Sequence, residues 1–124
     1  IRLADILLLK AEAYVETGNL QAAAALVNTV RNRAKLADLP ATTVSSKEKM
    51  ADAVLNERRL ELAFEGQRWF DLVRTGKVFS ILNSLNTRDS GRLPMTPVTE
   101  ETVLLPVPQT QIDKNPNLTQ NKGY

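Results

Sequence analysis

The sequence predicts an all-α fold that ends in an extended, proline-rich C-terminal tail. Through residue 85, apolar residues recur at helical spacing, and this part holds three glycines and a single proline, Pro40. The composition then changes, because five of the six prolines lie at Pro94 or later. We therefore expect residues 1–85 to form the helical part and residues 86–124 an irregular loop and a tail packed on it, all within one domain.

The first two predicted helices, residues 3–16 and 20–36, form an antiparallel hairpin. Gly18 suits the left-handed position that ends a helix, and Asn19 can cap the next one. Helices joined by so short a turn are neighbours. In the first helix the apolar stripe consists of Leu3, Ile6, Leu7, Leu9, Ala11, Ala13 and Tyr14. In the second it consists of Leu20, Ala23, Val27, Val30 and Ala34.

Three more helices are expected after a connecting loop at residues 37–46. The first covers residues 46–65, where Ser45 or Ser46 caps its start and Ser45 with Glu48 fits a capping box. It stops at Gly66, and the next, residues 67–75, stops at Gly76. The last covers residues 77–85.

In the tail, prolines keep "LLPVP" extended, which should bury Val103, Leu105 and Val107 or their neighbours. One helical turn is expected at residues 109–113 and a tight turn at residues 115–117.

The composition removes several classes of function. The chain has no cysteine and no histidine, so disulfides, thiol nucleophiles, Ser-His pairs and the commonest zinc ligands are absent. Its net charge is +2, and acids interleave with the basic residues, so the charge pattern gives no support for nucleic-acid binding. We predict no catalytic residue, no metal site and no cofactor. The chain also opens within helical periodicity, which indicates a piece of a longer protein.

One charged stretch, "ERRLELAFEGQRWFDLVRTG" at residues 57–76, needs a physical explanation. Glu57, Glu61 and Glu65 are spaced i+4 on a helix sector flanked by apolar residues, so they repel each other unless cations pair with them. Arginine is well suited, because its planar fork can satisfy carboxylates while partly desolvated. We predict a structural ion network between helices, formed by Glu57, Arg58, Glu61, Glu65, Arg68, Asp71 and Arg74.

The spacing of the glutamates also allows two other interpretations. Carboxylates at i, i+4 can reach the separation seen in retaining glycosidases. However, these glutamates project from one helix face, and nearby arginines would lower their pKa values, which makes poor general acids. A solvated surface ladder is the other alternative. Exchanging each glutamate for glutamine should abolish turnover in a glycosidase but only lower stability in a structural network.

Two resemblances emerge from these motifs. Leu7, Ala11 and Tyr14, followed by Gly18 and small and large apolar residues of the second helix, are similar to a tetratricopeptide-type hairpin. More specifically, "NERRLELAFEGQRWFDLVRTGK" and the ending "LLPVPQTQIDKNPNLTQNKGY" resemble, in order, two signatures of the SusD/RagB family of outer-membrane nutrient-binding lipoproteins. Lys122 departs from the proline often found at that position in the family.

The SusD/RagB resemblance implies a function and a location. It implies an α-α superhelix of tetratricopeptide-like hairpins, with this chain as its C-terminal portion. Such proteins are not enzymes. They capture polysaccharide, oligosaccharide or, in some branches, peptide at the cell surface and pass it to a SusC-type TonB-dependent outer-membrane transporter. An N-terminal lipid anchor, absent from this chain, would hold the full-length protein on the outer membrane.

The ligand surface in that family lies mostly in upstream regions, so this chain offers few candidates. Trp69 and Phe70 lie within the charged signature and are predicted to be core. In the loop after residue 85, Asn86, Arg88, Asp89 and Arg92 are the candidate ligand-binding residues, since their side chains can hydrogen-bond hydroxyls. The alternative function is a tetratricopeptide-type scaffold that binds a partner protein and no glycan.

Overall fold

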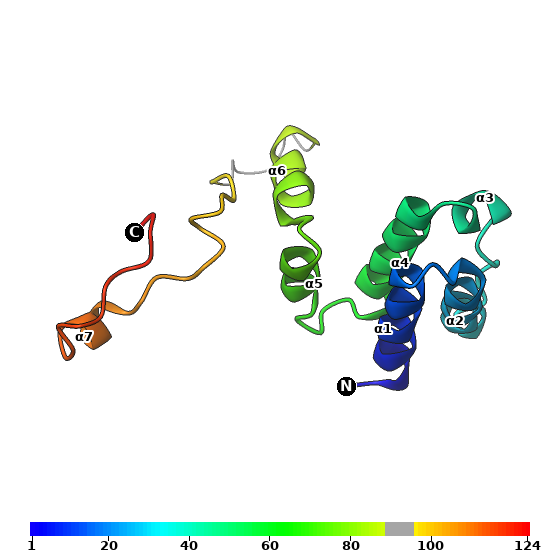
Figure 1. Cartoon of the computed structure of the whole chain (residues 1–124), viewed down its shortest axis with the longest axis horizontal. Helices are drawn as coiled ribbons and strands as arrows, with labels where there is room; N and C mark the ends of the chain where they lie inside the picture. The colour runs from blue at the N-terminus through cyan, green and yellow to red at the C-terminus, as the bar shows by residue number, and fades with distance from the viewer. Residues whose placement is uncertain (89–95) are drawn as a thin grey trace. The chain divides into compact units, whose positions relative to one another are not determined.

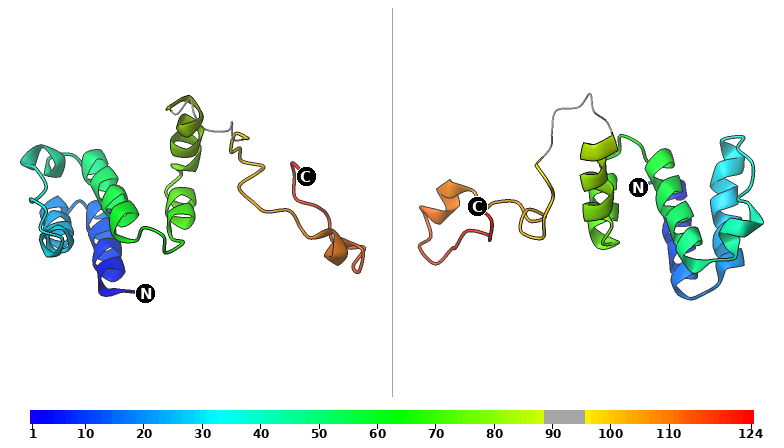
Figure 2. Two further views of the ribbon diagram at one scale, coloured as in Figure 1. Left: turned by 180° about the vertical axis from the view of Figure 1, so that it is seen from behind. Right: turned by 90° about the horizontal axis from the view of Figure 1, so that it is seen from above.

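The computed structural model describes residues 1–88 and 96–124, and the chain divides into two compact units, Ile1–Asp71 and Leu72–Tyr124. The described residues form helices, turns and extended segments without a strand, which confirms the all-α prediction (Figure 1). The first unit contains α1 (Leu3–Glu16), α2 (Leu20–Arg33), α3 (Ala41–Val44) and α4 (Lys47–Glu61). In it α1 packs against both α2 and α4, as two further views also show (Figure 2).

The turn between α1 and α2 is the one that the sequence predicts. Gly18 adopts φ +81°, and its N–H donates to the carbonyl of Val15, while the N–H of Asn19 donates to the carbonyl of Tyr14. This pair of bonds is a Schellman motif, which satisfies carbonyls at the helix end. Asn19 then caps α2 by accepting from the N–H of Ala22 at 3.3 Å. The hairpin is therefore specified locally by two adjacent residues.

The end of α2 lies earlier than predicted, at Arg33. Lys35 takes a left-handed conformation with φ +59°, and the N–H of Leu36 returns to the carbonyl of Arg31. A Schellman motif thus ends the helix at a residue other than glycine. Because lysine seldom takes this conformation, the sequence does not predict the helix end here.

The predicted bounds of the next helix are also corrected. Residues 41–44, expected as loop, form the single turn α3. Ser46 caps α4 by accepting from the N–H of Lys49, so the proposed capping box of Ser45 and Glu48 does not form. The helix ends at Glu61, before the predicted residue 65, because Phe64 and Gly66 both adopt positive φ and break the helical path.

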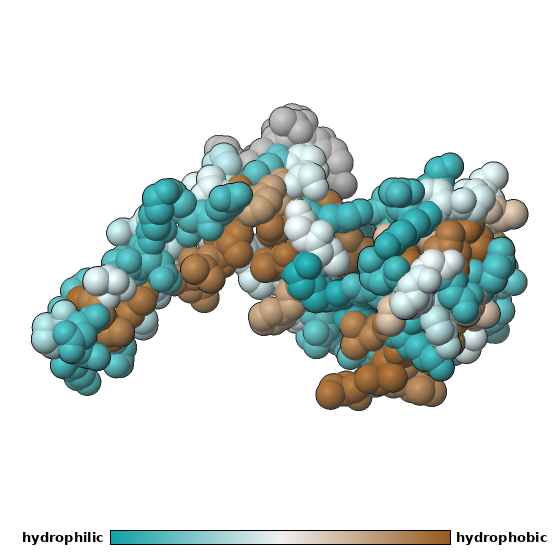
Figure 3. Space-filling model, viewed as in Figure 1, coloured by the Kyte–Doolittle hydropathy of each residue, from teal (hydrophilic) through white to brown (hydrophobic). Residues whose placement is uncertain are grey.

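The core of the first unit lies between α1, α2 and α4. Its fully buried members are Leu8, Ala11, Val15, Ala23, Val27, Met50 and Val54. On α2 the predicted stripe is largely right. On α1 it is rotated, since Leu8 is completely buried while Leu3, Ile6 and Leu9 are exposed. The buried arc of α1 faces two helices at once, and an apolar surface remains over its N-terminal end (Figure 3).

The second unit is held by short helices and by side-chain amides. It begins within α5 (Arg68–Arg74) and contains α6 (Val78–Arg88) and α7 (Gln109–Ile112), the helical turn expected in the tail. Asn83 of α6 bonds to both backbone groups of Val98, at 3.0 and 2.8 Å. Gln120 does the same to Val107, at 2.7 and 2.9 Å.

Two details of the tail prediction can be compared with the structure. The turn after α7 closes with a bond from the N–H of Leu118 to the carbonyl of Asn115, as predicted. Leu105, by contrast, is exposed, whereas Val103 and Val107 are half-buried.

Candidate functional site

A buried arginine lies at the centre of the charged signature. Arg58 of α4 is 3% exposed, and its Nε donates to Oδ2 of Asp71 in α5 at 2.8 Å. Its Nη1 donates to Oδ1 of Asp5 in α1, also at 2.8 Å. Burying an unpaired guanidinium would be very costly, and two carboxylates here supply the compensation. The three side chains thus tie three helices to one charged centre.

Glu57, one residue earlier, points to a different helix. It is buried, and Arg31 of α2 donates to its Oε2 from Nη1 at 2.9 Å. The Nε of Arg31 donates to the carbonyl of Ala37 at 2.8 Å. Arg31 therefore joins α4 to α2 and to the segment that follows α2.

Glu61 and Glu65 share a cation from the start of the chain. Arg2 pairs with Glu61 at 2.8 Å and with Glu65 at 2.7 Å, and Arg33 pairs with Glu61 at 2.6 Å. Hydrogen bonds to Glu65 and then Glu61 favour the charged guanidinium and raise the pKa of Arg2. Arg2 and Arg33 are themselves exposed, so these pairs are worth less than the buried ones.

The structure thus gives every glutamate of the ladder an arginine, although the arginines differ from those the sequence suggested. Arg58 binds the two aspartates instead of a glutamate, and Arg68 donates to the carbonyl of Leu55 at 3.2 Å. Arg74 also has an interaction partner. The members that sequence reasoning missed are Asp5, Arg2, Arg31 and Arg33. Asp5 could have been recognised from the sequence as a member of the network, because a carboxylate inside an apolar helix needs a partner.

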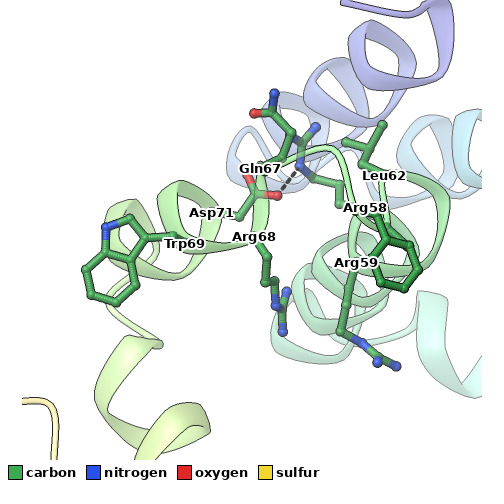
Figure 4. Close-up of a pocket in the computed structure, with 10 residues that line it drawn as sticks. Arg58, Arg59, Leu62, Gln67, Arg68, Trp69 and Asp71 are labelled. Carbon is green, nitrogen blue, oxygen red and sulfur yellow. Dashed lines mark hydrogen bonds and ion pairs between the residues drawn. The ribbon is translucent and has the colours of Figure 1, made fainter.

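Beside this network the first unit has a pocket of about 440 Å³. It is lined by the end of α4, the turn that follows and the start of α5 (Figure 4). Arg59, Gln67 and Arg68 supply its polar groups, and Leu62 and Trp69 are among its apolar ones. Trp69 is 38% exposed and Phe70 is more exposed, so the prediction that both belong to the core is wrong for this chain.

Of the four candidate ligand residues after residue 85, two lie on a described helix. Asn86 and Arg88 belong to the last turns of α6, which runs past the predicted end at residue 85. Asp89 and Arg92 lie outside the described residues. Within the described ranges, no cluster of metal-ligating side chains occurs. No described helix combines the length and hydropathy needed to cross a membrane.

Comparison with known proteins identifies the family. The model of the SusD family matches residues 1–124, which is the whole chain. The chain belongs to the SusD family. It is 36% identical to the SusD-like protein P38 of Formosa agariphila, over 99% of this chain and 24% of that protein. It is 32% identical to the starch-binding protein SusD of Bacteroides thetaiotaomicron, over 99% of this chain and 21% of that protein.

Solved structures agree with the family assignment. A SusD superfamily protein from Bacteroides vulgatus superposes with a TM-score of 0.82 at 30% identity, covering 100% of this chain and 27% of that one. A SusD-like protein from Bacteroides fragilis gives a TM-score of 0.76 at 32% identity, with 100% and 25% covered. This SusD-family chain therefore spans about a quarter of the length of its relatives and has their helical, tetratricopeptide-like fold.

Proposed function

We propose that this chain is the C-terminal part of a surface glycan-binding protein that captures polysaccharide or oligosaccharide. The observation that carries the proposal is the match of the SusD family over residues 1–124, together with 32% identity to a protein named for starch binding. By the same family relationship, the captured glycan would pass to a SusC-type TonB-dependent transporter. The full-length protein would be lipid-anchored at the outer face of the outer membrane.

Within that protein we propose a structural, non-catalytic role for the ion network. Glu57 and Glu61 are each bound by arginine, so neither is placed to protonate a leaving group or to attack a sugar. At the buried centre, Arg58 pairs with both Asp5 and Asp71. Such networks hold helices in register, and α1, α2, α4 and α5 all contribute to this one. A rigid base of this kind would support ligand-binding loops carried elsewhere in the protein.

The proposal is tested on a family-length protein that ends in this chain. Isothermal titration against starch-type, other neutral and acidic polysaccharides should show binding without cleavage of the glycan. Affinity capture from outer membranes should retain a TonB-dependent transporter. If no glycan binds and affinity capture recovers an unrelated protein partner, the tetratricopeptide-type scaffold would be supported instead.

The network's role is tested separately with Glu57→Gln and Glu61→Gln. Glycan binding per folded molecule should stay unchanged while the midpoint of unfolding falls. If the unchanged protein released reducing ends from a glycan and these variants did not, the protein would instead be a hydrolase.

A further inference from the structure

Two arginines of the first unit differ from the others in their partners. Arg2, Arg31, Arg33 and Arg58 each bind a carboxylate. Within the described part of the chain, Arg59 and Arg68 bind only neutral oxygens. Arg59 donates to Oδ1 of Asn56 at 3.2 and 3.0 Å, and Arg68 donates to the carbonyl of Leu55. These two guanidinium groups therefore keep an unneutralised charge and unused donors.

Both arginines line the same pocket of about 440 Å³. Their side chains extend to the same side of the connection between α4 and α5 (Figure 4). Burial is the main cause that lowers the pKa of Arg68, and the positive charge of Arg59 lowers it further. The negative charge of Asp71 raises it. Asp71 is already held by the Nε of Arg58, so it leaves the pocket positively charged. An anion placed there would relieve the repulsion between the two arginines.

The remaining lining suits a sugar ring beside that charge. Gln67 is exposed and offers an amide that can both donate and accept hydrogen bonds. Trp69 lies at the other edge of the pocket and is partly exposed, which leaves apolar surface beside the polar groups. Phe64 is fully exposed on a left-handed backbone with φ +65°. Non-glycine residues in that conformation carry strain, which tends to occur at functional sites.

We propose that this pocket binds the carboxylate or sulfate of an acidic glycan, with Arg59 and Arg68 as the anion-binding residues. Planar guanidinium groups match carboxylate and sulfate oxygens with paired hydrogen bonds. The pocket volume lies within the range of about 300–1,000 Å³ that is usual for small-ligand sites. The inference rests on the proposed glycan-binding function and narrows the substrate class of the protein to anionic glycans at this site.

The test is titration calorimetry on the 124-residue chain with an oligogalacturonate, a sulfated oligosaccharide and a neutral malto-oligosaccharide of equal length. At least one acidic ligand should bind, more weakly as salt rises, while the neutral one binds at least tenfold more weakly. Arg59→Gln should lower acidic-ligand affinity about tenfold, which corresponds to 1.4 kcal/mol. Lys49→Gln, which removes one exposed charge from another part of α4, should change it less than twofold.

Arg68→Lys provides the second variant, because it keeps the charge but removes the planar fork. Circular dichroism verifies that it folds, and its affinity should fall about as far as that of Arg59→Gln. Absence of acidic-ligand binding, or equal affinities for the unchanged chain and Arg59→Gln, overturns the inference. If the family-length protein binds neutral glycans while Arg59→Gln has no effect on acidic ones, the proposed function stands and this site is rejected.

Discussion

Arg58 donates from Nε to Oδ2 of Asp71 at 2.8 Å, and both side chains are almost completely buried. Replacing Arg58 by alanine removes the guanidinium that pairs with two buried carboxylates, those of Asp5 and Asp71. Breaking a buried pair by removing one partner typically costs about 3–5 kcal/mol. We therefore expect Arg58→Ala to lower the free energy of unfolding by about that amount in urea denaturation.

The adjacent arginine supplies the control for this prediction. Arg59→Ala removes the same side chain from an exposed position, so it should change stability by no more than about 0.5 kcal/mol. Equal losses for the two variants would show that Arg58 contributes nothing beyond an ordinary surface arginine.

Ser46 and not Ser45 should determine the stability of the start of α4. The side chain of Ser46 accepts from the N–H of Lys49 and donates to Glu48, whereas Ser45 donates to a carbonyl within α3. Loss of a serine N-cap costs about 1 kcal/mol. Ser46→Ala should therefore lower the free energy of unfolding by about that amount, and Ser45→Ala should lower it less. A larger loss in Ser45→Ala would restore the capping box that the sequence suggested.

The same cap predicts a pH effect. A backbone hydrogen bond and then the Ser46 hydroxyl hold the pKa of Glu48 below its ordinary value in the folded protein. Because the folded pKa is depressed, this contribution is present above the unfolded pKa and is lost as pH falls through the folded pKa. In Ser46→Ala the Glu48 pKa should rise toward its ordinary value in an NMR titration, and an unchanged Glu48 pKa would show that the Ser46 hydroxyl does not contribute.

How far the sequence could predict the molecule depends on how local each feature is. The α1–α2 turn was predictable because Gly18 and Asn19 both act within their own turn. The buried arc of α1 was not, because Leu7, Leu8 and Leu9 are consecutive and several apolar stripes fit equally well. Only the positions of two packing helices select Leu8 over Leu9.

The ion network follows the same rule. That the glutamates need cations follows from their i+4 spacing alone. Which cation each one meets depends on tertiary structure. Arg58 reaches Asp5 across 53 positions of the chain, and Arg31 reaches Glu57 across 26. Proximity in the sequence therefore favours arginines other than the ones that the folded chain brings to each carboxylate.

Gly18 should be hard to replace, for a reason that involves only the backbone. Nothing lies within 4 Å of a Cβ built on it, so alanine would meet no obstacle, yet its φ of +81° is unfavourable for any L-residue. Gly18→Ala should therefore lower the free energy of unfolding by about 1–2 kcal/mol. The opposite change in the free energy of unfolding is expected for Lys35→Gly. Lys35 also has a positive φ, which glycine adopts without steric strain. Stabilisation by Gly18→Ala in thermal denaturation would contradict the assigned turn.

Two neighbouring leucines of α1 differ sharply in burial. Leu8 is 0% exposed and Leu9 is 40% exposed. Truncating a buried leucine costs about 2–5 kcal/mol, so Leu8→Ala should destabilise the chain by that amount, and Leu9→Ala by well under half of it. Comparable losses for the two would favour the predicted stripe, which includes Leu9 and leaves out Leu8.

The exposed face that includes Leu9 also has a consequence for solubility. Together with Leu3 and Ile6 it leaves an apolar surface that favours association or dye binding. Ile6→Lys should reduce both the binding of a hydrophobic dye and any concentration-dependent increase in mass, while the unfolding midpoint stays nearly unchanged. Ile6 and Leu8 are two residues apart on the same helix. Leu8→Lys should lower the unfolding midpoint strongly while Ile6→Lys leaves it nearly unchanged, which separates the solvent face from the core. Dye binding that persists unchanged in Ile6→Lys would place the apolar surface elsewhere.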